Sequence, residues 1–176
     1  MEIYFLRHAN AGEPKLNRAK DEQRPLDKLG IEQCHIVGRA LAALKIEFDA
    51  VISSPLVRAR QTAEIAATAA GHERPVIIDD ALRPEASYEQ FEELLARHKD
   101  KDAIMVVGHN PSQTEFLNRL LTGGDSGPID FKKGAIARVD TEPGKPAVLK
   151  WLMPPKVVKA IQQASARSSR PKTVSK

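Results

Sequence analysis

Short apolar runs alternate along the chain with segments whose apolar residues have helical spacing. The runs are typical of buried strands and occupy residues 2–7, 49–53, 75–79 and 103–108. The last run, from Ile104 to Val107, is unbroken, as a strand covered on both faces requires. Helical spacing is found over residues 29–44, 56–70, 88–97 and 111–121. The alternation predicts an α/β layered fold.

The C-terminal part of the chain departs from this alternation. Two strands are predicted at residues 135–139 and 148–153, followed by a helix over 157–164. We therefore expect one domain over residues 1–164, a three-layer sandwich with a mostly parallel central sheet and helices on both faces. Residues 165–176 are rich in serine and basic residues, and we expect a flexible basic tail there.

One internal segment, residues 11–28, lacks helical or strand periodicity. It is polar and is interrupted by Gly12, Pro14 and Pro25. We expect an irregular segment there, placed so that it can serve as a lid.

Composition changes this picture little but excludes several classes of protein. Hydrophobic residues make up 41% and charged residues 28% of the 176 residues, which is typical of a folded globular protein. Cys34 is the single cysteine, and no Cys/His set has zinc-like spacing. No signal peptide and no run of eighteen apolar residues is present. We expect a cytoplasmic protein without a metal or other cofactor and without a membrane partner.

The net charge of +4 does not indicate a nucleic-acid partner. Residues 167–176 hold four basic residues and no acidic one, so the remainder of the chain is neutral. A basic nucleic-acid-binding surface on the domain is therefore not expected.

Polar residues follow three of the predicted strands. Arg7 and His8 end the first strand, Arg58 follows the second after a Ser-Ser-Pro turn, and His109 follows the strand at 103–108. Ligands bind at the carboxyl ends of strands in open α/β sheets, so these loops are expected to converge. Two arginines and two histidines then form an anion site, since guanidinium groups match phosphate oxygens.

These residue types suit phosphoryl transfer to a histidine. A neutral imidazole at His8 is a competent nucleophile, and Arg7 and Arg58 are expected to lower its pKa. The guanidinium groups and the ring N–H of His109 can stabilise the equatorial oxygens of the transition state, each donor contributing roughly 3–4 kcal/mol. The scheme requires no metal.

Three segments carry a resemblance to a known family. LRHANA at residues 6–11, SSPLVRARQTA at 53–63 and VVGHN at 106–110 resemble the signature segments of the histidine phosphatase superfamily, in order and spacing. RPLDKLG at 24–30 and WLMPP near the end resemble its small phosphohistidine phosphatases of the SixA type. The similarity covers about residues 1–160 and implies a phosphoglycerate mutase-like fold.

The resemblance also implies roles for individual residues. His8 is expected to become phosphohistidine, Arg7 and Arg58 to bind the phosphoryl oxygens, and His109 to complete the pocket. Arg24 matches an arginine of the RPL segment that reaches the same site from the lid and is expected to bind substrate.

The chain departs from the family pattern at two points. Ala9 follows the catalytic histidine where glycine is usual, which puts the close backbone approach there in doubt. Many members also take a proton donor from the loop after the third strand, and Glu85 is the candidate here. An imidazole leaving group departs easily near neutral pH and makes a strong general acid unnecessary.

The leading functional hypothesis is a phosphatase for phosphohistidine on a protein, such as the histidine-phosphotransfer domain of a signalling relay. The short chain leaves little length for walls around a small substrate, so an open site is expected. Phosphate or sulfate fits the same site. A small-molecule phosphomonoesterase and a non-catalytic module that binds phosphohistidine remain alternatives. His35, His72, His98 and Cys34 lack a partner pattern and are expected to be structural or solvated.

Overall fold

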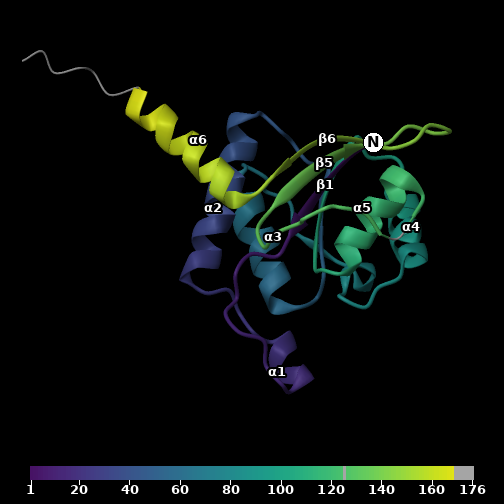
Figure 1. The fold of residues 1–176 in the computed structure, drawn as a ribbon, viewed down its shortest axis with the longest axis horizontal. Helices are drawn as coiled ribbons and strands as arrows, with labels where there is room; N and C mark the ends of the chain where they lie inside the picture. Colours follow the sequence, from purple (N-terminus) through teal and green to yellow (C-terminus); the bar gives the residue numbers. More distant parts are fainter. Residues whose placement is uncertain (125, 169–176) are drawn as a thin grey trace, which may run out of the picture.

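The computed structural model describes residues 1–124 and 126–168 and contains a six-stranded sheet with the order β3-β2-β4-β1-β5-β6 (Figure 1). The strands are β1 (Glu2–Arg7), β2 (Ala50–Ser53), β3 (Ile77–Ile78), β4 (Ala103–Gly108), β5 (Ile136–Asp140) and β6 (Val148–Met153). Strands β1 to β4 pair in parallel, whereas β5 is antiparallel to both of its neighbours. The expected mostly parallel sheet is confirmed, including the antiparallel late strands.

Helices cover both faces of this sheet. They are α1 (Arg18–Glu22), α2 (Lys28–Ala43), α3 (Val57–Ala69), α4 (Tyr88–Arg97), α5 (Ser112–Thr122) and α6 (Pro155–Ser168), with a 3-10 turn at Asp80–Leu82. Buried residues of α2 and α3 belong to one core cluster, and those of α4 and α5 belong to the other. In Figure 1 these two helix pairs lie on opposite sides of the sheet, so the three-layer arrangement is confirmed.

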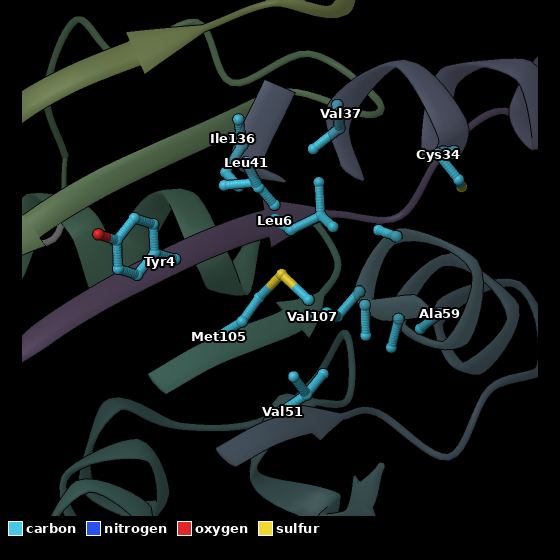
Figure 2. Close-up of a cluster of buried hydrophobic side chains, with 14 of the residues drawn as sticks. Tyr4, Leu6, Cys34, Val37, Leu41, Val51, Ala59, Met105, Val107 and Ile136 are labelled. Carbon is cyan, nitrogen blue, oxygen red and sulfur yellow. The ribbon is translucent and has the colours of Figure 1, made fainter. Parts of the chain in front are cut away.

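The alternation of side chains along β1 supplies both cores. Tyr4 and Leu6 point into the cluster on the α2 and α3 side, where they lie with Met105 and Val107 of the neighbouring β4 (Figure 2). Ile3 and Phe5, the alternate residues of the strand, enter the cluster on the other face. A central strand that is buried on both faces is therefore apolar at successive positions.

The register of the parallel strands brings their carboxyl ends to one edge. Arg7 pairs with Gly108, and the backbone N–H of His8 donates to the Gly108 carbonyl at 3.0 Å. On the other side of β4, Ser54 N–H donates to the Val107 carbonyl at 2.9 Å. The residues that follow β1, β2 and β4 are thus held side by side.

Three expectations about secondary structure need correction. The segment at residues 11–28 contains the five-residue helix α1, which Asn17 caps by accepting a hydrogen bond from the N–H of Lys20 at 3.0 Å. Strand β3 has two residues instead of five, and both are exposed at the sheet edge. Helix α6 continues to Ser168, so the first four residues of the expected tail are helical. Residues 169–176 lie outside the described part.

No helix in the described residues is long and apolar enough to cross a membrane.

Candidate active site

His8 lies directly after β1 and is buried, with 6% of its surface exposed. Its Nδ1 is 2.8 Å from the carbonyl oxygen of Ala9. Because a carbonyl oxygen only accepts hydrogen bonds, Nδ1 carries the proton and Nε2 keeps its lone pair. The arrangement leaves Nε2 as the ring nitrogen with a free lone pair.

The surroundings of His8 keep its ring neutral. Burial lowers the pKa of His8 to about 3, the hydrogen bond to Ala9 opposes this, and the charges of Arg58 and Arg7 lower the pKa further. The sequence indicated the arginines as the cause, but the loss of hydration is the larger effect. A neutral imidazole is what nucleophilic attack on phosphorus requires.

His109 follows β4 and is 1% exposed. Its ring centroid is 5.0 Å from that of His8, and the two ring planes make an angle of 50°. Nε2 of His109 lies 2.8 Å from the hydroxyl oxygen of Ser54, whereas Nδ1 is buried and has no hydrogen-bond partner among the described residues. Burial, followed by the neighbouring His8, lowers the pKa of His109 to about 2.

Arg7 and Arg58 are both anchored by one end of the guanidinium group. Nη1 of Arg7 donates to the carbonyl oxygen of Phe131 at 2.8 Å, and Nη1 of Arg58 donates to that of Asp21 at 2.9 Å. The Nε–H groups of both arginines are buried, and within the described chain neither has a partner. Unused, buried donors on fixed guanidinium groups are suited to bind an oxyanion.

Helix α3 adds to the positive field. Arg58 lies in its first turn, and the N-cap residue Leu56 makes no side-chain hydrogen bond to the helix end. The backbone N–H groups there carry the positive end of the helix dipole, which favours a bound anion. Within the residues described, no three His, Cys, Asp or Glu side chains are grouped so as to hold a metal ion.

Arg24 is buried in the lid. Its Nε donates to a carboxylate oxygen of Asp21 at 2.8 Å, and its Nη1 donates to the carbonyls of Ala11 at 2.8 Å and Gly12 at 3.1 Å. These bonds fasten the start of the lid to α1. A direct contact between Arg24 and substrate stays a prediction.

Glu85 lies at the rim and is exposed. It forms an ion pair with Arg18 of α1, and it lines a pocket of about 270 Å³ together with Arg58 and Asp21. Glu85 therefore shares a pocket with Arg58, whereas His8, Arg7 and His109 do not line this pocket. Its role as proton donor stays a prediction.

The segment at residues 24–30 fixes the loop that follows His8. Asp27 accepts hydrogen bonds from the Gly30 N–H at 2.8 Å and from Nδ2 of Asn10 at 2.6 Å. A Cβ atom at Gly30 would lie 2.0 Å from the carbonyl oxygen of Asn10. Ala9 is buried in the same loop, and its N–H donates to the Thr62 hydroxyl at 3.1 Å. The methyl group of Ala9 is thus accommodated beside His8.

Sequence analysis gave no role to four residues that contact the candidate site residues or the loop after His8. Asp21, Asp27, Ser54 and Thr62 each contact a residue distant in the chain, and the periodicity of the sequence does not predict these contacts. The N-cap position of Asp27 before a helical segment was the one available signal.

Comparison with known proteins identifies a family that matches the N-terminal half of the chain and relatives that match most of it. Residues 3–97 match the model of the histidine phosphatase superfamily (branch 1). The chain is 33% identical over 167 residues to an uncharacterized protein of Picosynechococcus, a match that covers 88% of this chain and all of the relative. It is 26% identical over 178 residues to the phosphohistidine phosphatase SixA of Escherichia coli strain K12, covering 92% of this chain and all of SixA.

Solved structures share the fold. The protein histidine phosphatase SixA in complex with tungstate superposes with a TM-score of 0.78 at 24% identity, covering 89% of this chain and 98% of that one. The α-ribazole phosphatase from Shigella flexneri gives 0.70 at 19% identity, covering 88% and 97%. These likenesses confirm the expected phosphoglycerate mutase-like fold. The chain belongs to the histidine phosphatase superfamily, where it is a phosphohydrolase that resembles the small SixA-type members.

Proposed function

We propose that the protein is a phosphohistidine phosphatase that acts on a phosphorylated protein, such as a histidine-phosphotransfer domain, through a covalent phospho-His8 intermediate. The observation that carries the proposal is the buried, neutral ring of His8, whose Nε2 is free beside unused donors of Arg7 and Arg58. The similarity to the phosphohistidine phosphatase SixA of Escherichia coli, which extends over the whole length of SixA, supports the substrate class.

The proposed reaction has two displacements at phosphorus. Nε2 of His8 attacks the phosphorus atom, the N–P bond of the substrate breaks, and the substrate imidazole leaves with the electron pair and takes up a proton. Water then attacks the phospho-His8, its N–P bond breaks, and the electron pair returns to Nε2. The net reaction consumes one water and releases histidine and inorganic phosphate.

The arginines supply the positive charge for both displacements. The transferred group spreads negative charge over its equatorial oxygens, and fixed guanidinium donors stabilise that charge. His109 completes the set of donors around the same group. We propose that the reaction needs no metal, because Arg7 and Arg58 already neutralise the phosphoryl oxygens.

We propose Glu85 as proton donor for substrates with poor leaving groups. The pocket that Glu85 lines together with Arg58 supports this role. An imidazole has a near-neutral pKa and is a good leaving group, whereas an alkoxide needs a proton donor. Glu85→Gln is therefore expected to reduce turnover of an alkyl phosphate much more than turnover of phosphohistidine.

Two features favour a protein substrate in the cytoplasm. The side chain of Leu16 is fully exposed in the lid and lines the pocket beside Arg58, where an apolar group can contact a docked protein. Cys34 is a lone buried thiol, which suits a reducing compartment.

The test is phosphate release from a phosphohistidine-bearing protein domain, measured with chelator present and compared with release from an aryl phosphate. His8→Ala is expected to abolish release, whereas the exposed His35→Ala serves as the matched control and retains it. Mass spectrometry of rapidly quenched enzyme is expected to find the phosphoryl group on His8.

Other outcomes of this experiment would favour one of the alternatives or exclude part of the proposal. Equal turnover of the aryl phosphate would favour the small-molecule phosphomonoesterase, and binding of phosphohistidine without release would favour the non-catalytic module. Loss of activity with chelator that returns with added metal would exclude the metal-independent reaction.

A further inference from the structure

Ser54 and His109 form a buried side-chain pair, and the proposed displacement steps give Ser54 no role. Ser54 follows β2 and His109 follows the parallel neighbour β4, so the strand register holds the two residues side by side. Ser54 is fully buried, and its Oγ lies 2.8 Å from Nε2 of His109. A buried hydroxyl requires an acceptor for its proton.

The direction of this hydrogen bond follows from the other neighbours of Ser54. The N–H of Leu56, 3.4 Å from Oγ, is a donor and cannot accept the hydroxyl proton. Within the described residues, Nε2 of His109 is the one acceptor placed at hydrogen-bond distance from Oγ. Ser54 therefore donates to Nε2, and the single proton of the neutral ring lies on Nδ1.

We propose that Ser54 is a positioning residue that fixes His109 as the Nδ1–H tautomer, so that Nδ1 donates a hydrogen bond to the transferred phosphoryl group. Nδ1 is the buried ring nitrogen that lacks a partner within the described chain, and the centroid of this ring lies 5.0 Å from that of His8. The phosphoryl contact rests on the proposed function, whereas the tautomer does not. The opposite tautomer would turn a lone pair toward an anionic oxygen.

The two histidines thereby acquire opposite roles from the same protonation state. Both carry the proton on Nδ1, but the carbonyl of Ala9 engages Nδ1 of His8 and leaves its lone pair on Nε2. Ser54 engages Nε2 of His109 and leaves its N–H on Nδ1. One ring is a nucleophile and the other a donor because a backbone carbonyl binds Nδ1 of His8, whereas a side-chain hydroxyl binds Nε2 of His109.

The tautomer is measured directly on the free protein with ¹⁵N-labelled histidine. Two-bond ¹H–¹⁵N correlation spectra are expected to show His109 with a pyrrole-type Nδ1 and a pyridine-type Nε2. Ser54→Ala is expected to mix the tautomers or to favour the Nε2–H form, and Ser54→Thr, which keeps the hydroxyl, is expected to restore the Nδ1–H form. Ser53→Ala removes an equally buried neighbouring hydroxyl, which donates to the Ser54 carbonyl, and is expected to change nothing.

Binding and activity test the second half of the proposal. Addition of inorganic phosphate is expected to shift the Nδ1 proton resonance of His109, and Ser54→Ala is expected to lower kcat/KM about tenfold to a hundredfold. An Nε2–H ring in the unsubstituted protein would overturn the proposal, even if Ser54→Ala fails to fold. A tautomer that Ser54→Ala leaves unchanged, or a proton resonance that phosphate does not shift, would also overturn it. An Nδ1–H ring that shifts with phosphate, in an enzyme that does not hydrolyse phosphohistidine, would refute the proposed function alone.

Discussion

Asp21 contacts Arg58 twice, through its carbonyl oxygen at 2.9 Å and through a carboxylate oxygen at 3.3 Å from the same Nη1. The other carboxylate oxygen accepts from Nε of Arg24 at 2.8 Å. The hydrogen bond from Arg24 is the chief reason that the pKa of Asp21 falls to about 2, so the carboxylate is charged at neutral pH. One residue of the short helix α1 thus joins the lid to the phosphoryl pocket.

Removal of the Asp21 carboxylate is expected to loosen this connection. Asp21→Ala leaves Arg24 without its carboxylate partner and releases one contact of Arg58, so kcat/KM is expected to fall about tenfold. The free energy of unfolding is expected to fall by about 2 kcal/mol, because nearly buried guanidinium donors lose an acceptor. Lys20→Ala, an exposed position on the same helix, is the control. Steady-state kinetics and urea unfolding check both effects, and equal values for the two variants would contradict this role.

The grouping of the candidate site residues was predictable because each lies at or after an apolar run that ends at the same edge of the sheet. His8 and His109 are adjacent to such runs, and Arg58 lies in a recognisable turn and helix. Asp21 was not predictable, since its partners are fixed by the path of the lid, which sequence periodicity does not reveal. Helix α1 was missed for a related reason: it is short, buries none of its residues, and lies between prolines. The apolar residues around β3 predicted a longer buried strand. In the structure two residues pair with β2 and are exposed, so the length of the apolar run did not indicate the length of the strand.

The close contact at Gly30 makes a prediction about the loop that follows His8. In Gly30→Ala the new methyl group would meet the Asn10 carbonyl oxygen, so backbone must shift. The free energy of unfolding is expected to decrease by about 1–3 kcal/mol, and kcat is expected to fall with the displaced loop. Gly124→Ala, where a Cβ would lie 3.7 Å from the hydroxyl oxygen of Thr122, is the matched control. Thermal unfolding and turnover of both variants are the measurements, and a Gly30→Ala enzyme as stable as the control would show that the loop has room to adjust.

The buried histidines predict how stability depends on pH. His8 and His109 have pKa values near 3 and 2 in the folded protein, whereas an imidazole in the unfolded chain has an ordinary value of 6.5. The unfolded state therefore binds more protons between pH 6.5 and 3, and stability falls as the pH falls through this window. Each ring is expected to contribute a loss of about 2 kcal/mol between pH 7 and pH 5.

This dependence is measured by urea unfolding at a series of pH values. In His8→Asn the free energy of unfolding is expected to decrease substantially less between pH 7 and pH 5 than in the unsubstituted protein. The exposed His35→Asn is expected to show the full decrease. A stability that does not change between pH 7 and pH 5 would mean that the two rings titrate as they do in the unfolded chain.

The exposed leucine of the lid separates the two classes of substrate. Leu16 lines the pocket beside Arg58, so a docked protein is expected to bury its side chain, whereas an aryl phosphate held at the arginines is not. Leu16→Ser is therefore expected to raise KM for a phosphohistidine-bearing domain about tenfold, as the loss of one buried leucine contact predicts, with kcat unchanged. Turnover of the aryl phosphate is expected to stay the same. Ile161→Ser removes an equally apolar exposed side chain from α6 and is the control. An equal loss of kcat/KM on both substrates would mean that Leu16 supports the conformation of the lid. An unchanged kcat/KM on both would mean that the protein substrate binds elsewhere on the surface.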